Sequence, residues 1–155
     1  DEAFKNTSLS EVKIPDSVIY IGINAFSYIE TLTEVTIGNS VETISNGAFS
    51  YTSLSKVIIP NRVKTIGNEA FSNIETLTSV TIGKNVKTIG KDAFKNTSLS
   101  EVIIPYGIKN YKNAFDENVK FIIREQKSYE EYLEEVKKKS KKKKKFFPDL
   151  PKIFS

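Results

Sequence analysis

The chain of 155 residues contains no cysteine, histidine, methionine or tryptophan. Without cysteine it forms no disulfide bond and offers no thiolate to a metal, so cysteine usage does not assign a redox compartment. A catalytic site would have to be built from carboxylates, lysines or hydroxyls, because the usual base and nucleophile side chains of histidine and cysteine are missing. The remaining candidates are scattered through positions that recur along the chain. We therefore expect no enzymatic activity, no metal and no other cofactor.

A long apolar segment is also absent, since no run approaches the roughly 18 residues that a membrane-spanning helix needs. The chain has no initiator methionine and begins in the middle of a recurring pattern. We therefore expect a piece of a longer protein, in which any signal peptide would lie upstream.

Net charge is missing from most of the chain. Residues 1–124 contain 13 basic and 13 acidic side chains, so the net charge of +4 belongs to residues 125–155. The high isoelectric point therefore describes the end of the chain and not its body. We expect no specific nucleic-acid partner, because the body has no basic excess and the basic run at the end is not accompanied by arginine or aromatic residues within the body.

Repetition is what the sequence does contain. The dipeptide Ala-Phe recurs at intervals of 22, 23, 22, 23 and 21 residues. A fixed period of this length is the signature of a solenoid, in which each repeat forms one coil. Residues 3–12 are identical to residues 93–102, which indicates tandem duplication. The phenylalanines are Phe4, Phe26, Phe49, Phe71, Phe94 and Phe115.

Each repeat is predicted to contain one strand whose apolar side chains face a shared core. In the repeat that starts at Phe49, Val57 and Ile59 have the two-residue spacing that places both side chains on one face of a strand. Leu54 enters the core just before them, and Pro60 ends the strand. Stacking such strands at about 4.8 Å would form a parallel ladder along the solenoid.

A second apolar pair, such as Val63 and Ile66, is predicted to close the core on the return side of each coil. A glycine follows this pair in three repeats, and we expect these glycines to occupy turns with positive φ. A polar residue before Ala-Phe is predicted to begin a short helical turn. The glycines are Gly22, Gly67 and Gly90, and the polar residues are Asn24, Glu69 and Asp92.

Short and long repeats alternate. Long repeats carry Ile-Glu-Thr-Leu where short repeats carry Thr-Ser-Leu, and the added residue brings an extra apolar anchor at Ile29 and Ile74. The unit of duplication is therefore a pair of coils.

The consensus L-x-x-V-x-I-P-x-x-V-x-x-I-G-x-x-A-F resembles the BspA-like, or Treponema-type, class of leucine-rich repeat, over residues 3 to about 115. The resemblance implies a secreted or cell-surface protein with a role in adhesion, and it brings no catalytic motif. Members of this class often have cysteine shortly after Ala-Phe, where Thr7, Thr52 and Thr97 stand in this chain.

The expected fold is therefore a leucine-rich-repeat solenoid over residues 1–124, mostly β, with a parallel strand ladder, short return strands and helical turns. Residues 125–145 are predicted to form a C-terminal capping helix that runs into a lysine-rich segment, followed by an irregular tail at 146–155. Ser128 and Glu131 form a capping box, and Tyr129, Tyr132 and Leu133 begin a narrow apolar helix face.

The outward residues of the strands are the predicted protein-binding site, because they form a continuous surface on a rigid backbone. Within them Ile58 and Ile103 make an apolar streak without a predicted cover. The alternative for these residues is a plain solvated strand face. One column contains Glu11, Glu34, Lys56, Ser79 and Glu101, and the other contains Lys13, Thr36, Ile58, Thr81 and Ile103, with Ile122 as a continuation.

Two further features are weaker candidates. Tyr20, Tyr28, Tyr51 and Tyr106 are expected at turn or return-side positions, each standing singly, and tyrosine is favoured at interfaces. A lysine run near the end could bind an anionic polymer or lipid head groups, or it could be a solvated spacer. That run contains Lys137, Lys138, Lys139, Lys141, Lys142, Lys143, Lys144 and Lys145.

Two functions remain open from the sequence. The first is a non-catalytic adhesion module that binds a protein, either a host matrix protein or another cell-surface protein. The second is a passive stalk that presents another domain, with the lysine tail as a linker or as a sticker for an anionic surface.

Overall fold

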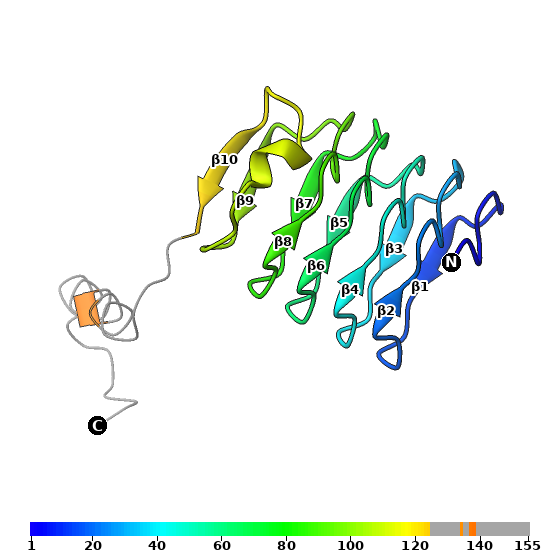
Figure 1. Cartoon of the computed structure of the whole chain (residues 1–155), viewed down its shortest axis with the longest axis horizontal. Helices are drawn as coiled ribbons and strands as arrows, with labels where there is room; N and C mark the ends of the chain where they lie inside the picture. The colour runs from blue at the N-terminus through cyan, green and yellow to red at the C-terminus, as the bar shows by residue number, and fades with distance from the viewer. Residues whose placement is uncertain (125–133, 135–136, 139–155) are drawn as a thin grey trace, which may run out of the picture. The chain divides into compact units, whose positions relative to one another are not determined.

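The structure, a computed structural model, describes residues 1–124 and, beyond them, Glu134, Lys137 and Lys138. Residues Asp1–Arg124 form one compact unit, in which successive coils stack side by side along the chain (Figure 1). This solenoid confirms the predicted fold class. The predicted capping helix at 125–145 and the irregular tail at 146–155 lie outside the described residues, apart from the three just named.

One strand of each coil lies on the same side of the solenoid, which we call the front face. The front strands pair in parallel as β1 with β3, β5 with β7 and β9 with β10. Their bounds are β1 Glu11–Lys13, β3 Glu34–Thr36, β5 Lys56–Ile58, β7 Ser79–Thr81, β9 Glu101–Ile104 and β10 Lys120–Ile123.

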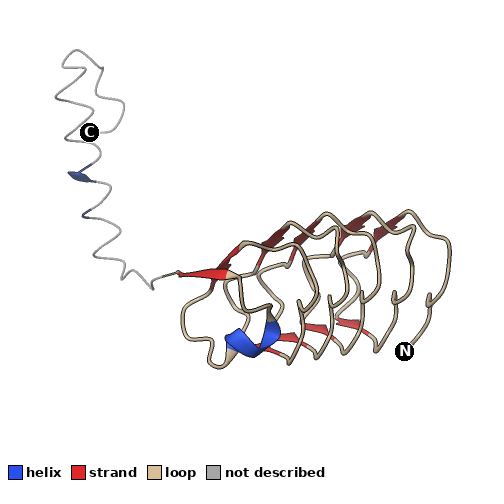
Figure 2. Cartoon of the chain, turned by 90° about the horizontal axis from the view of Figure 1, so that it is seen from above, coloured by secondary structure: helices blue, strands red, loops and turns tan. Residues whose placement is uncertain are grey.

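The return segments form a second row of strands on the opposite side of the coils (Figure 2). These shorter strands make one uninterrupted parallel sheet in the order β2-β4-β6-β8. Their bounds are β2 Tyr20–Ile21, β4 Thr43–Ile44, β6 Thr65–Ile66 and β8 Thr88–Ile89. The predicted return strands are therefore present. After β8 no further return strand is described, and a 3₁₀ helix, η1 at Tyr111–Ala114, occupies the turn that ends at Phe115.

The core runs along the axis between the two rows. Phe49, Phe71 and Phe94 are fully buried, and the six phenylalanine rings stack on one another with centroid separations of 5.0 to 5.3 Å. Ile29 and Ile74, the extra anchors of the long coils, are also fully buried. The inward residues predicted from the repeat are thus confirmed as core.

The front ladder differs from the prediction because it is not continuous. From β1 to β9 the front strands pair where the starting residues are 23 apart, as Glu11 and Glu34 are, but not where they are 22 apart, as Glu34 and Lys56 are. The last pair, β9 with β10, does not follow this spacing. The missing residue belongs to the short turn after Phe49, directly before the chain enters β5. The front pairing is interrupted after this shorter turn, whereas the return strands β4 and β6, which lie before and after the same turn, stay paired.

The predicted role of Gly22, Gly67 and Gly90 is wrong, since none of them has a positive φ. Their place in the fold follows from close packing: a Cβ on Gly67 would lie 2.5 Å from the amide nitrogen of Asn46 in the preceding coil. The residues with a left-handed backbone conformation lie two positions after these glycines. Asn24, Glu69 and Asp92 have φ between 52° and 57°, and they form tight turns instead of starting helices.

Candidate binding surface

The front strands alternate exposed and inward side chains, as in β5, where Lys56 and Ile58 are exposed and Val57 is buried. The same alternation exposes all ten side chains of the two predicted columns. The strand registers align them across coils, with Glu11 opposite Glu34 and Ile58 opposite Thr81. The ten residues therefore share one accessible face, and their role in binding stays a prediction.

The second column contains an apolar row that the strand pairing extends to the last strand. Ile103 lies opposite Ile122, and Ile58, Ile103 and Ile122 are 56%, 45% and 41% exposed. We call these three side chains, with Thr81 between the first two, the front apolar row. Exposed isoleucines that line up across coils form a larger apolar surface than scattered single residues would.

A groove of about 670 Å³ lies where the front ladder is interrupted between β3 and β5. Both strands line it, and four of the ten predicted residues are among its walls: Glu34, Thr36, Lys56 and Ile58. The groove thus places a carboxylate, a hydroxyl, an ammonium group and an exposed isoleucine around one hollow. We call it the β3–β5 groove. This combination suits a protein side chain or short segment, because an apolar contact sits beside polar groups that can orient it.

The tyrosines are arranged differently from the prediction. Tyr28 and Tyr51 do not stand singly, because their rings stack with centroids 4.5 Å apart, and Lys5 lies 5.8 Å from the centroid of Tyr28. Both tyrosines have a positive φ, at a position where Asn6, Asn73 and Asn96 occupy other coils. The two rings belong to neighbouring coils, so the sequence of either repeat taken alone does not predict the stack.

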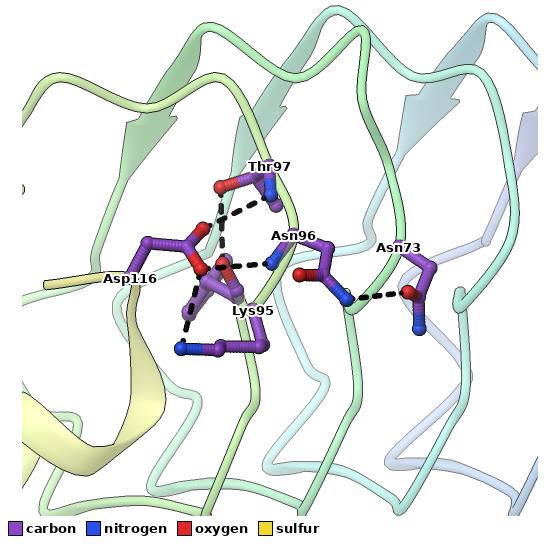
Figure 3. A network of polar contacts seen from close by, with 6 residues as sticks. Asn73, Lys95, Asn96, Thr97 and Asp116 are labelled. Carbon is purple, nitrogen blue, oxygen red and sulfur yellow. Dashed lines mark hydrogen bonds and ion pairs between the residues drawn. The ribbon is translucent and has the colours of Figure 1, made fainter. Parts of the chain in front are cut away.

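The same turn edge ends in a polar network at the last coil (Figure 3). In earlier coils the amide at this position donates to a carbonyl of the next coil, as Asn73 does to Lys95. At the end of the array the amides of Asn96 and Thr97 donate instead to the carboxylate of Asp116, each at 3.3 Å. Lys95 also pairs with Asp116 at 3.4 Å. The carboxylate of Asp116 therefore accepts the hydrogen bonds that a backbone carbonyl of the next coil accepts elsewhere along this edge.

A cluster of basic residues was missed by the sequence reading, because residues 1–124 carry no net charge. Arg62, Lys64, Lys84 and Lys87 line a hollow of about 470 Å³ on the return side, together with Glu42 and Tyr106. The lack of acidic residues in these two return segments, together with the recurrence of Lys64 as Lys87 in the next coil, was the signal that could have found them. Hydrogen bonding and charge from Lys64, followed by Arg62, lower the pKa of Glu42 below its ordinary value.

The residues that the structure describes contain neither a candidate metal site nor a candidate membrane-spanning helix. Within that part of the chain no group of three or more acidic residues is arranged to hold a metal ion. No described helix is long and apolar enough to cross a bilayer. Of the predicted lysine run, Lys137 and Lys138 are described and exposed, and the other six lysines lie outside the described residues.

A family model described as a BspA type leucine-rich repeat region of six copies matches residues 1–121. This match agrees with the resemblance carried by the repeat consensus. No protein with curated annotation matches the chain.

Solved structures of leucine-rich repeat proteins share the fold. The pneumococcal vaccine antigen PcpA has a TM-score of 0.64 and 22% identity, over 75% of this chain and 31% of that protein. A leucine-rich repeat protein from Bacteroides ovatus ATCC 8483 has a TM-score of 0.54 and 23% identity, over 76% and 37% of the two chains. A leucine rich cell surface protein from Faecalibacterium prausnitzii A2-165 has a TM-score of 0.51 and 19% identity, over 85% and 64%. The chain spans less than two thirds of the length of each of these proteins.

Proposed function

Because this chain belongs to the BspA type leucine-rich repeat family, we propose that it is a non-catalytic module that binds a protein on its front face. The observation that carries the proposal is the β3–β5 groove, where the interrupted ladder leaves a hollow beside the front apolar row. We take the ligand to be a host matrix protein or another cell-surface protein, and the role to be adhesion.

The similarity in fold to two solved structures supports a surface location for this protein. One structural neighbour is a leucine rich cell surface protein, and another is a pneumococcal vaccine antigen. Both are similar to this chain in fold, and we extend the location to it as part of the proposal: the protein is exposed on a cell surface or secreted.

The physical case rests on how interfaces gain affinity. A few apolar residues that become fully desolvated carry most of the binding free energy, while polar neighbours exclude water around them. Ile58 is the exposed apolar residue of the groove, and Glu34, Thr36 and Lys56 surround it. The coils that hold these residues stack through a buried core, so little ordering of the backbone is needed on binding.

The test uses the full chain with Ile58→Glu, measured by biosensor against a panel of immobilised host matrix proteins and by adherence to whole cells. Burying the introduced carboxylate against a protein partner is unfavourable, so binding should fall about tenfold or more. Ile19→Glu is the matched control, because Ile19 is equally exposed but lies on the return side.

Two outcomes would count against the proposal. Equal loss in both variants would show that binding does not use the front face. A wild-type chain that binds no protein in the panel and no cell would favour the alternative function, a passive stalk that presents another domain.

A further inference from the structure

The return segments of the third and fourth coils concentrate positive charge. Residues 60–67 and 83–90 contain Arg62, Lys64, Lys84 and Lys87 and no acidic residue. We call these four side chains the basic edge. The following return segment, residues 105–112, continues the pattern with two more lysines and again no acid.

The sheet of return strands places Lys64 and Lys87 at equivalent positions of successive coils. The amide of Lys64 donates to the carbonyl of Glu42 at 2.8 Å, and the amide of Lys87 donates to the carbonyl of Lys64 at 2.9 Å. Equivalent residues of successive coils are therefore separated by about one strand spacing, roughly 4.8 Å. Lys64 and Lys87 are thus aligned along the solenoid, and Arg62 and Lys84 line the same hollow beside them.

Little of this charge is neutralised locally. Arg62 and Lys64 share one carboxylate, that of Glu42, at 3.3 and 2.7 Å. Among the ion pairs formed between described residues, none includes Lys84 or Lys87. The acidic residues of the same coils lie elsewhere, in the Ala-Phe turns and on the front strands; they are Glu69, Glu75, Asp92 and Glu101. The neutral charge balance of the body therefore hides a local excess of positive charge on the return side.

The side chains beside the basic edge indicate which class of anion would bind there. The exposed neighbours on the return strands are Thr65 and Thr88, and Asn85 lies in the hollow with Tyr106. Hydroxyl and amide groups between cations suit a chain that carries both hydroxyls and acidic groups. A membrane surface would call for apolar side chains that insert beside the lysines, and single-stranded nucleic acid would call for a series of aromatic rings, whereas Tyr106 is the single aromatic ring in the hollow.

We propose that the basic edge binds a linear acidic polysaccharide laid along the solenoid axis. The site is separate from the proposed protein-binding face, because its residues belong to the return side and those of the β3–β5 groove to the front strands. A surface protein with both sites would hold a glycan and a protein at the same time.

The test measures binding of the full chain to heparin, used as a linear sulfated polysaccharide, by titration at several salt concentrations. The variant Lys84→Gln/Lys87→Gln should weaken binding about tenfold at low salt, and its affinity should depend less on salt because two ionic contacts are gone. The matched control is Lys13→Gln/Lys56→Gln, which removes the same charge from exposed lysines of the front face and should change the affinity less than threefold.

A third variant, in which the eight lysines of the 137–145 run are changed to glutamine, separates the basic edge from that run. In this background, adding Lys84→Gln and Lys87→Gln should still weaken the binding of heparin. Equal losses in the two double variants would overturn the proposal, because binding would then follow net charge alone. Loss of all measurable binding in the third variant would also overturn it, as would competition by single-stranded DNA as strong as that by heparin at equal charge concentration. Thermal unfolding of each variant checks that the fold is retained.

Discussion

At the scale of single residues, the threonine that replaces the family's frequent cysteine has a clear structural use. Thr52 is buried, and its hydroxyl donates to the carbonyl of Phe49 at 2.9 Å. Thr7 and Thr97 make the same bond in their coils. A buried hydroxyl that finds a backbone acceptor in its own turn avoids the penalty of an unpaired polar group. The position therefore needs a small side chain and accepts a polar one.

The core phenylalanines give the first prediction at this scale. Phe71 is fully buried and stacks between Phe49 and Phe94 at 5.2 and 5.3 Å. Phe71→Ala leaves a cavity that the neighbouring coils cannot fill, and it should lower the free energy of unfolding by roughly 3–5 kcal/mol. Urea unfolding followed by circular dichroism measures the change. Phe4→Ala is the control, because Phe4 is about half exposed at the first coil, and an equal loss there would contradict the prediction.

At the scale of elements, the short turn after Phe49 explains why the β3–β5 groove exists. The chain covers five positions from Phe49 to Leu54 but six from Phe26 to Leu32. The front strand that follows the shorter turn does not pair with its predecessor. The alternation of repeat lengths, which first indicates a two-coil unit, therefore also marks where the front ladder is interrupted, and the β3–β5 groove lies at one of these interruptions.

The end of the array gives the prediction at this scale. Asp116 accepts hydrogen bonds from two backbone amides and pairs with Lys95, so Asp116→Ala leaves both amides without this partner. The free energy of unfolding should fall by about 1–3 kcal/mol, the usual cost of such a loss. Glu117→Ala is the control, since the neighbouring Glu117 is exposed and should change the stability by less than 0.5 kcal/mol or so. Equal changes in the two variants would show that Asp116 does not cap the array.

At the scale of the whole molecule, the local excess of positive charge on the return side is the property with the widest consequence. Glu42 is the one acidic residue among the walls of the basic hollow. Glu42→Gln removes its negative charge and should tighten heparin binding by the full chain, because Arg62 and Lys64 would no longer be partly neutralised. Lys84 and Lys87 remain in this variant, so a weaker affinity would argue against the polysaccharide site.

The pH dependence of this effect follows from the lowered pKa of Glu42. Its charge stabilises the folded chain above the unfolded-state pKa, and this contribution disappears as the pH falls through the lowered folded-state value. Protonated Glu42 no longer neutralises its neighbours. The affinity of the wild type for heparin should therefore approach that of Glu42→Gln as the pH falls through this range, while a constant difference would show that Glu42 does not act through its charge.

The period of the sequence was enough to predict the solenoid, the inward residues and the exposed columns of the front face. Repetition carries this information because equivalent residues of stacked coils occupy equivalent places. The residues equivalent to Leu54, Val57 and Ile59 therefore mark the core side of the other coils. The family resemblance rested on the same residues.

Tertiary structure alone decided the features that depend on how one coil meets the next. Whether a shortened turn interrupts the front or the return ladder depends on where the backbone absorbs the missing residue. The Tyr28–Tyr51 stack and the bonds of Asp116 likewise join residues of different coils. The net charge of residues 1–124 cannot show that basic side chains gather in one hollow of the return side, because that depends on where each side chain lies. The sequence by itself therefore determined the coil, and the stacking of coils determined its hollows, its cap and its charged edge.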